Sequence, residues 1–213
     1  MENKRLAFSM IELIMVIVVM GILSAVAMPQ LNSDTRVGAR DNIYSALQFT
    51  RHLALIDNRT NPENTKWQME LWTIAFASDS DSDGGYNYSI GSNQNHNNAF
   101  SQNECAIDPA NGQYFYAQNG SKNIGINQSP NVFLGINFGV KEVKFTNGCT
   151  GAKHIAFDNL GRPFVGSTFS VQPLYSKVMI KDCTITVKFK DTDLENLEFS
   201  IKKETGFIEI VKG

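Results

Sequence analysis

The sequence predicts an α+β fold in which one long N-terminal helix packs on an antiparallel, β-rich head. Two observations support this prediction. Apolar residues fill positions 8–28 and then recur at helical spacing as far as about residue 58. From residue 59 to residue 213, short runs that alternate between apolar and polar residues are separated by turn signals, which is typical of antiparallel strands. A length of 213 residues suits one globular domain plus an additional element.

The segment 8–28 is almost wholly apolar, and its only charged residue is Glu12. As a helix it would span roughly 30 Å, the thickness of the hydrocarbon core of a bilayer. Lys4 and Arg5 precede it, and basic flanks stay on the cytoplasmic side of a membrane, so the chain after Met28 is expected outside. The segment therefore predicts a transmembrane helix.

Two simpler interpretations of this segment remain open. A cleaved secretory signal has a shorter apolar core that ends in small residues, and 24–27 mimics such an end. A plain membrane anchor explains the length of the run but not Glu12. A carboxylate in hydrocarbon is costly and usually functional, which favours an interpretation that gives Glu12 a role.

A basic pair, Lys4-Arg5, precedes the run Ala7-Phe8-Ser9-Met10-Ile11-Glu12-Leu13, which opens the apolar segment. These residues closely resemble the class III signal of type IV prepilins and pseudopilins. The resemblance implies that a prepilin peptidase cuts between Ala7 and Phe8, which makes residues 1–7 a leader peptide, and that Phe8 becomes N-methylated. Most family members have glycine before the cut, so Ala7 is a departure. Pro29 stands where these proteins often carry a helix-kinking proline.

The same resemblance implies that Glu12 pairs with the N-terminal ammonium of Phe8 on a neighbouring subunit. Two opposite charges compensate each other in a dry helix bundle, whereas either charge alone would be penalised. Glu12 would then set the register of assembly. The alternative is a carboxylate that reaches water at the membrane edge.

Beyond Pro29 the helix is expected to continue as an amphipathic half, residues 29–58. Its apolar stripe should bury against a sheet. The pattern stops near Asn58, and Asn61-Pro62 breaks it. The stripe consists of Ala39, Ile43, Ala46, Leu47, Thr50, Leu53 and Ala54.

The head, residues 59–213, begins with a predicted strand from Trp67 to Phe76. A polar insertion follows at about 79–131, rich in asparagine, serine and glycine. Because such a stretch buries little apolar surface, we expect loops with short strands, pinned to the domain by aromatic residues. Those residues are Tyr86, Tyr88, Tyr114, Phe115 and Tyr116.

Sheet-like sequence resumes after residue 131. Alternation predicts one strand at Val140–Phe145, and Ile155–Phe157 leads into a turn at 158–163. Three further strands are expected to form an antiparallel meander. They are Thr184–Phe189, Leu197–Lys202 and Phe207–Val211.

The run Ile155–Pro163, the strand that Cys183 opens and the Thr205-Gly206 hairpin resemble the C-terminal half of GspH/FimT-like minor pseudopilins. The resemblance covers only part of the chain, and the polar insertion departs from it. It implies a β-sandwich-like head set against a long, pilin-like helix. It also implies a minor subunit at or near a filament tip that helps to prime assembly.

The cysteines predict one disulfide and one free thiol, because an exported domain with an odd number has one left over. We expect a bridge between Cys149 and Cys183, with Cys105 left over, although spacing alone does not fix the connectivity. The cysteines and histidines lie too far apart in sequence to predict a structural zinc site.

Asp79, Asp81 and Asp83, followed by Gly84, resemble the start of a calcium loop. The closing acid of an EF-hand should fall at residue 90, which is Ile90, so this is not an EF-hand. Calcium is therefore the single cofactor candidate. The alternative is a solvated acidic turn.

No catalytic motif occurs in the sequence, so we predict no enzyme activity and no catalytic residue. The first hypothesis is a minor pilin or pseudopilin that assembles through its N-terminal helix into a type II secretion-like, competence or type IV pilus filament. Its partners would be a prepilin peptidase, other subunits and an inner-membrane assembly platform. Its location would be the bacterial inner membrane, single-pass, with the head in the periplasm.

Two alternatives belong to other classes. One is a filament-tip DNA receptor, but the net charge is −2 and the tail 204–213 carries two acids, one lysine and no arginine, which disfavours DNA. The other is a membrane-anchored adhesin or enzyme that uses the helix only as an anchor. Arg162, in its Gly-Arg-Pro turn, is a candidate for a partner contact or for a local ion pair.

Overall fold

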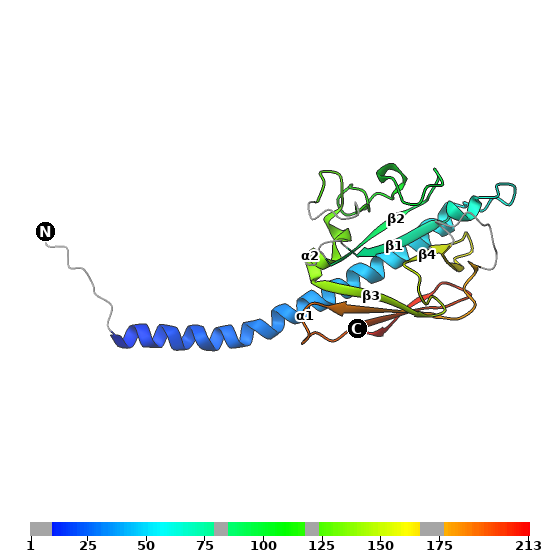
Figure 1. Ribbon diagram of the computed structural model, residues 1–213. Helices are drawn as coiled ribbons and strands as arrows, with labels where there is room; N and C mark the ends of the chain where they lie inside the picture. Colours follow the sequence, from blue (N-terminus) through cyan, green and yellow to red (C-terminus); the bar gives the residue numbers. More distant parts are fainter. Residues whose placement is uncertain (1–9, 79–84, 118–123, 167–176) are drawn as a thin grey trace.

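The computed structural model describes residues 10–78, 85–117, 124–166 and 177–213, without the side chains of residues 25–34. Its first element is α1 (Met10–Ile56), a helix of 47 residues. The first part of α1 projects away from the rest of the chain, and its second part lies along the head (Figure 1). The helix ends two residues from the predicted boundary, ahead of Asn61-Pro62, because proline disfavours a helical residue before it.

The described residues of the head form two four-stranded sheets in which all neighbouring strands are antiparallel. The β1 sheet has the order β2-β1-β4-β5, and the β6 sheet has the order β3-β6-β7-β8. The strands of the β1 sheet are β1 (Trp72–Ser78), β2 (Tyr86–Gly91), β4 (His154–Phe157) and β5 (Pro163–Val165). The strands of the β6 sheet are β3 (Val140–Asn147), β6 (Cys183–Phe189), β7 (Leu197–Ile201) and β8 (Ile208–Lys212).

Short helical elements lie between α1 and the first strand and between later strands. They are η1 (Trp67–Met69), η2 (Gln102–Glu104), η3 (Pro130–Val132) and α2 (Leu134–Phe138). The last of them ends at Gly139, whose left-handed backbone terminates the helix directly before β3. A glycine adopts this conformation without the steric cost that a side chain would impose.

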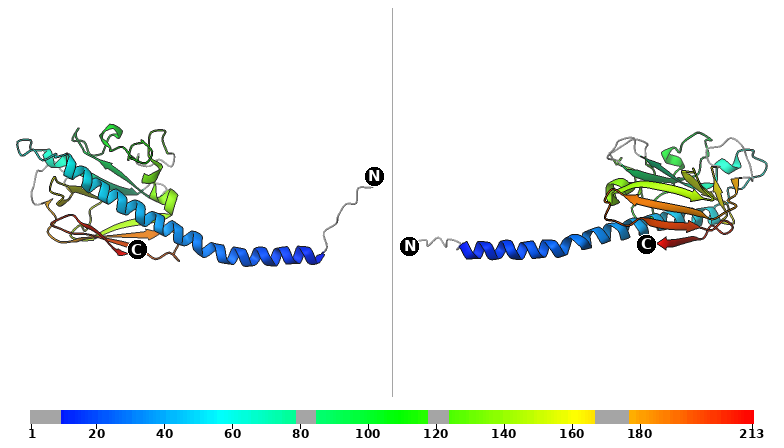
Figure 2. Two further views of the ribbon diagram at one scale, coloured as in Figure 1. Left: turned by 180° about the vertical axis from the view of Figure 1, so that it is seen from behind. Right: turned by 60° about the horizontal axis from the view of Figure 1, so that its bottom comes forward.

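The two sheets and the second part of α1 enclose one hydrophobic core. Phe76 of β1 and Phe145 of β3 meet with ring centroids 5.7 Å apart, which brings the sheets face to face. Helix α1 contacts β1 and β4 of one sheet and β8 of the other. Seen from behind, it lies across the head with the strands beyond it (Figure 2, left).

The predicted stripe of α1 is the face that enters this core. Ala39, Ile43 and Leu47 are fully buried, and Ala46 and Ala54 are nearly so. Alanine at several of these positions lets the helix approach the sheets closely, while Ile43 and Leu47 supply the larger buried area. The predicted burial of this stripe against the sheets is therefore confirmed.

Arginine side chains attach α1 to loops of the head. Arg36 Nε donates to the carbonyl of Glu195 at 3.0 Å, and Arg51 Nε donates to the carbonyl of Thr205 at 3.0 Å. Arg51 also passes against Gly161, where a Cβ atom would come within 3.0 Å of the guanidinium. The two hydrogen bonds join residues more than 150 positions apart, so they fix where α1 lies relative to the C-terminal meander.

The predicted fold class needs a correction. In the part of the chain that the structure describes, no helix is both long enough and apolar enough to cross a membrane. The expected membrane half of α1 is therefore wrong, as are the transmembrane character and the single-pass location in an inner membrane. The described fold is an extended helix combined with two four-stranded antiparallel sheets.

The first predicted strand also needs a correction. Residues 67–69 form the 3₁₀ helix η1, and β1 begins only at Trp72. All three residues of η1 are buried, so their apparent alternation does not separate an inner from an outer face. Trp67 packs in a small second cluster with Leu71, Ala156 and Phe164. The later strands, including the β6–β7–β8 meander, are confirmed to within two residues.

The predicted disulfide is present between Cys149 and Cys183, with Cα atoms 5.1 Å apart. Cys149 lies in the turn after β3, and Cys183 begins β6 opposite Asn147. The bridge thus closes the end of the β3–β6 pair. Cys105 is the free, buried cysteine.

Replacing Cys149 and Cys183 together by serine should lower the free energy of unfolding by about 3 kcal/mol, because the bridge restricts the unfolded chain across a separation of 34 residues. Urea unfolding with and without a reductant measures this. The wild type should lose the same amount when reduced, and the double variant should not respond. A wild type indifferent to reduction would contradict the prediction.

Candidate functional site

The most unusual surface of the molecule is the projecting part of α1. Every large apolar side chain from Met10 to Leu23 is at least 48% exposed, and Met10 reaches 88%. These residues surround the helix instead of forming one stripe. A helix that is apolar on all sides is stable only when other apolar groups cover it. We call residues 10–24 of α1 the exposed apolar segment.

Glu12 is the acidic residue in the first turn of α1 and is exposed. A negative charge there is favourable in the isolated chain, because the N-terminal end of a helix carries a partial positive charge. Burial of the segment against other apolar groups would remove water from this carboxylate, which is costly unless an opposite charge accompanies it. Glu12 is therefore the one ionised group of the exposed apolar segment whose surroundings would change on assembly.

Five of the predicted site residues lie outside the described part of the chain. Ala7 and Phe8, the expected processing site, lie outside the described residues, and so do Asp79, Asp81 and Asp83 of the calcium candidate. Pro29 lies within α1, and its expected kink stays a prediction. Among the described residues, no group of three acidic, histidine or cysteine side chains is placed to hold a metal ion.

The turn between β4 and β5 is organised by a buried carboxylate. Asp158 is 1% exposed, and its Oδ1 accepts hydrogen bonds from the backbone N–H groups of Leu160 and Arg162. Its Oδ2 lies 2.7 Å from both Nε and Nη2 of Arg162. Arg162 therefore forms the local ion pair, which is one of the two predicted alternatives. Sequence reasoning missed that Asp158 is the buried partner.

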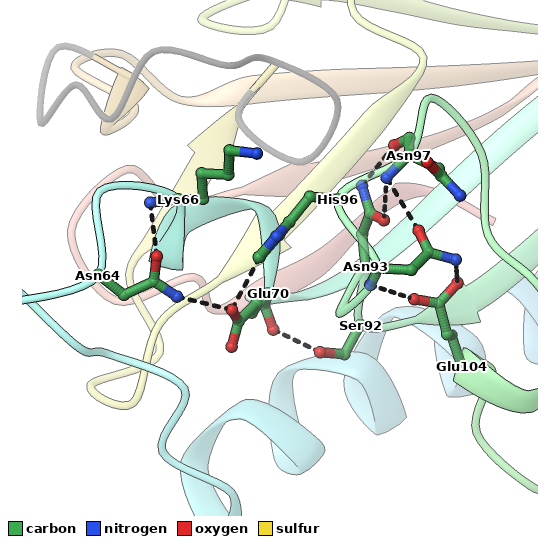
Figure 3. Close-up of polar contacts among 9 residues, drawn as sticks. Asn64, Lys66, Glu70, Ser92, Asn93, His96, Asn97 and Glu104 are labelled. Carbon is green, nitrogen blue, oxygen red and sulfur yellow. Dashed lines mark hydrogen bonds and ion pairs between the residues drawn. The ribbon is translucent and has the colours of Figure 1, made fainter.

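Loop 92–104 of the polar insertion is held in place by hydrogen bonds around two carboxylates (Figure 3). Glu70 Oε1 accepts from Asn64 Nδ2 at 2.9 Å and lies 2.9 Å from His96 Nε2. Glu104 accepts from the backbone and the side chain of Asn95 and from the N–H of Ser101. These contacts hold the loop 92–104 to the segment before β1, so they account for the asparagine-rich composition structurally.

The aromatic residues of the insertion behave as predicted in part. Tyr88 and Phe115 are buried, whereas Tyr86, Tyr114 and Tyr116 are half-buried.

Burial, followed by the negative charge of Glu104, raises the pKa of the Cys105 thiol to about 12. Cys105 is consequently a protonated thiol in the core at neutral pH and a poor nucleophile.

His154 is a second buried titratable group, on β4. Burial, followed by the nearby positive charge of Lys177, lowers its pKa to about 4. The imidazole is therefore neutral at physiological pH.

No protein-family model matches this chain, and neither a curated protein nor a solved structure matches it. The resemblance to prepilins therefore rests on the N-terminal residues themselves, and family membership stays a prediction.

Replacing Asp158 by alanine should destabilise the protein by about 3 kcal/mol, because two backbone N–H groups and a guanidinium lose their acceptor. Urea unfolding measures the loss. Asp158→Asn is the matched control, since it keeps an acceptor for the backbone but not the charge, and it should lose less. Equal losses for both variants would show that the ion pair, not the turn, dominates.

The pKa of His154 predicts a pH dependence of stability. The folded pKa lies below the unfolded value, so the unfolded chain binds more protons between pH 6.5 and about 4, and stability falls as the pH drops through this window. Thermal unfolding of the wild type and of His154→Gln at a series of pH values measures the effect. The variant should show a shallower decline, and parallel curves would contradict the assignment.

Proposed function

We propose that this protein is a minor filament subunit of the pilin or pseudopilin kind, which assembles through the exposed apolar segment of α1. The observation that carries the proposal is the exposure of every large apolar side chain from Met10 to Leu23. Contiguous apolar surface of this extent marks an interaction site. Helices of neighbouring subunits are the proposed cover, because they can surround the segment on all sides.

The two parts of α1 bury different amounts of apolar surface, which supports this function. The stripe that contains Ile43 and Leu47 is buried in the core of the head, whereas the exposed apolar segment is not part of that core. Arg36 and Arg51 fix the helix to the head, so packing of the projecting part would also position the head. One continuous helix thus supplies both the scaffold of the domain and the proposed assembly surface.

The residues at the start of the segment support the pilin class in particular. The resemblance of the run from Ala7 to Leu13 to a prepilin signal implies cleavage before Phe8 and a new N-terminal ammonium. The same resemblance implies that Glu12 pairs with that ammonium on a neighbouring subunit, so that the two charges compensate each other in a bundle of apolar helices. Prepilin peptidase, sister subunits and an assembly platform follow as the proposed partners.

Two resemblances favour a minor subunit over a major one. The first is the sequence Ile155–Pro163, which ends in Gly161-Arg162-Pro163. The second is the C-terminal meander with its disulfide. The filament to which the subunit belongs is proposed only as a class: secretion pseudopilus, competence pseudopilus or type IV pilus. A deletion strain assayed for transformation, secretion and piliation on the same cultures would separate these three.

Replacing Glu12 by alanine should leave cleavage at Ala7–Phe8 intact and reduce incorporation into sheared filaments about tenfold, since each contact would leave the Phe8 ammonium without its partner. Immunoblots of sheared and cell-bound fractions measure incorporation, and mass spectrometry of the mature N-terminus measures processing.

Ser24→Ala is the matched control. Ser24 lies on the same segment, and its hydroxyl donates within the helix to the carbonyl of Met20, so this variant should assemble normally. Normal incorporation of Glu12→Ala would disprove the proposed contact. An unprocessed N-terminus in the wild type would contradict the pilin class altogether.

A further inference from the structure

A cavity of about 510 Å³ lies between the second part of α1 and the polar insertion. Residues of α1 form one wall, and Tyr88 of β2, residues 108–110, Phe115 and Asn131 form the others. The volume falls in the range of sites for small organic ligands. The exposed apolar segment does not line it, so the cavity has no part in the assembly surface proposed above.

Three aromatic side chains form a continuous apolar wall of this cavity. Phe49 and Phe115 have ring centroids 5.5 Å apart, and Phe115 and Tyr88 have centroids 6.2 Å apart. The faces of aromatic rings carry partial negative charge and attract cations. The wall therefore suits a ligand that has an apolar body and a positive charge.

Both ionised residues that line the cavity are acidic. Asp41 is an exposed residue of α1, and its Oδ1 is 2.9 Å from Arg40 Nε, but Arg40 does not itself line the cavity. Asp108 is 3% exposed. Among the lining residues of the described chain there is no lysine, arginine or histidine.

Asp108 is held by neutral donors. Its oxygens accept hydrogen bonds from the backbone of Ala110 and from the side chains of Asn111, Ser129 and Asn131. Hydrogen bonds of this kind stabilise a carboxylate without cancelling its charge. The negative potential of Asp108 thus remains in the wall of the cavity.

Two more groups complete the arrangement. Asn42 Nδ2 donates to the carbonyl of Asn131 at 3.1 Å, while the buried Asn42 Oδ1 has no hydrogen-bond partner among the described residues. A buried acceptor without a donor is costly, and an N–H donor of a ligand would satisfy it. Burial is the main cause that raises the pKa of Tyr88, and the negative charge of Asp108 adds to it, whereas a hydrogen bond with the side chain of Asn42 lowers it by less. The phenol of Tyr88 is therefore neutral.

We propose that this cavity binds a small organic cation, an ammonium group carried on an aromatic or aliphatic body. The body would lie against Phe49, Phe115 and Tyr88. The ammonium would face Asp41 and Asp108 and donate to Asn42 Oδ1. An anion of the same shape would be excluded by both carboxylates. The proposal does not depend on filament assembly.

Isothermal titration calorimetry on the full chain tests this, with a nonionic detergent to cover the exposed apolar segment. The probes are 2-phenylethylammonium, its neutral analogue 2-phenylethanol and the anion 3-phenylpropionate. We expect saturable binding of the ammonium, binding of the alcohol that is weaker by about fivefold or more, and no saturable binding of the acid. Equal binding of all three, or no saturable binding of the ammonium in the millimolar range, would overturn the proposal.

Variants locate the binding to this cavity. Ser45, an exposed residue of α1, lines it, so Ser45→Phe should fill the space and abolish binding of both the ammonium and the alcohol. Asp41→Asn should weaken the ammonium about three- to fivefold and leave the alcohol unchanged. Glu63→Gln removes a charge from an exposed residue that does not line the cavity and is the matched control. Unaltered ammonium binding by Ser45→Phe and Asp41→Asn would place the ligand elsewhere and disprove the site.

Discussion

The packing of the second part of α1 against the head is the interaction on which the rest of the structure depends. Ala39, Ile43 and Leu47 are fully buried there, and they belong to the same core as the inner faces of both sheets. Because close-packed interiors tolerate little displacement, this contact fixes the axis of the helix relative to the head. It fixes the direction in which the exposed apolar segment projects, and it supplies one wall of the cavity.

The two parts of α1 therefore have different surroundings, and their apolar residues are arranged differently. In its second part they form a stripe, and the polar side chains on the other faces reach water or the loops of the head. In the exposed apolar segment they surround the axis, which leaves no polar face to present to water. The apolar stripe packs into the core of the head, whereas the exposed apolar segment is stable only when other apolar groups cover it.

The described parts of the polar insertion contain few apolar residues and are held together mainly by hydrogen bonds. Asparagine side chains both donate and accept hydrogen bonds, so they can replace backbone partners that a regular sheet would supply. Within the insertion they converge on the carboxylates of Glu104 and Asp108, and His96 joins the loop to the carboxylate of Glu70. The aromatic residues Tyr88 and Phe115 join the resulting loops to the main core. The same three components, amide, carboxylate and aromatic ring, are those that surround the cavity.

The sequence by itself determined the long helix, its buried stripe and the β6–β7–β8 meander, because these depend on periodicities carried by neighbouring residues. It also determined Ala7, Phe8 and Glu12 as site candidates, through a contiguous motif. Only the tertiary structure decided that residues 67–69 form η1 and that Cys149 pairs with Cys183 and not with Cys105. It likewise placed Asp108 and Asp158 inside the protein and brought Asp108 near Asp41. These features join residues far apart in the chain, and local patterns do not encode which distant segments will meet.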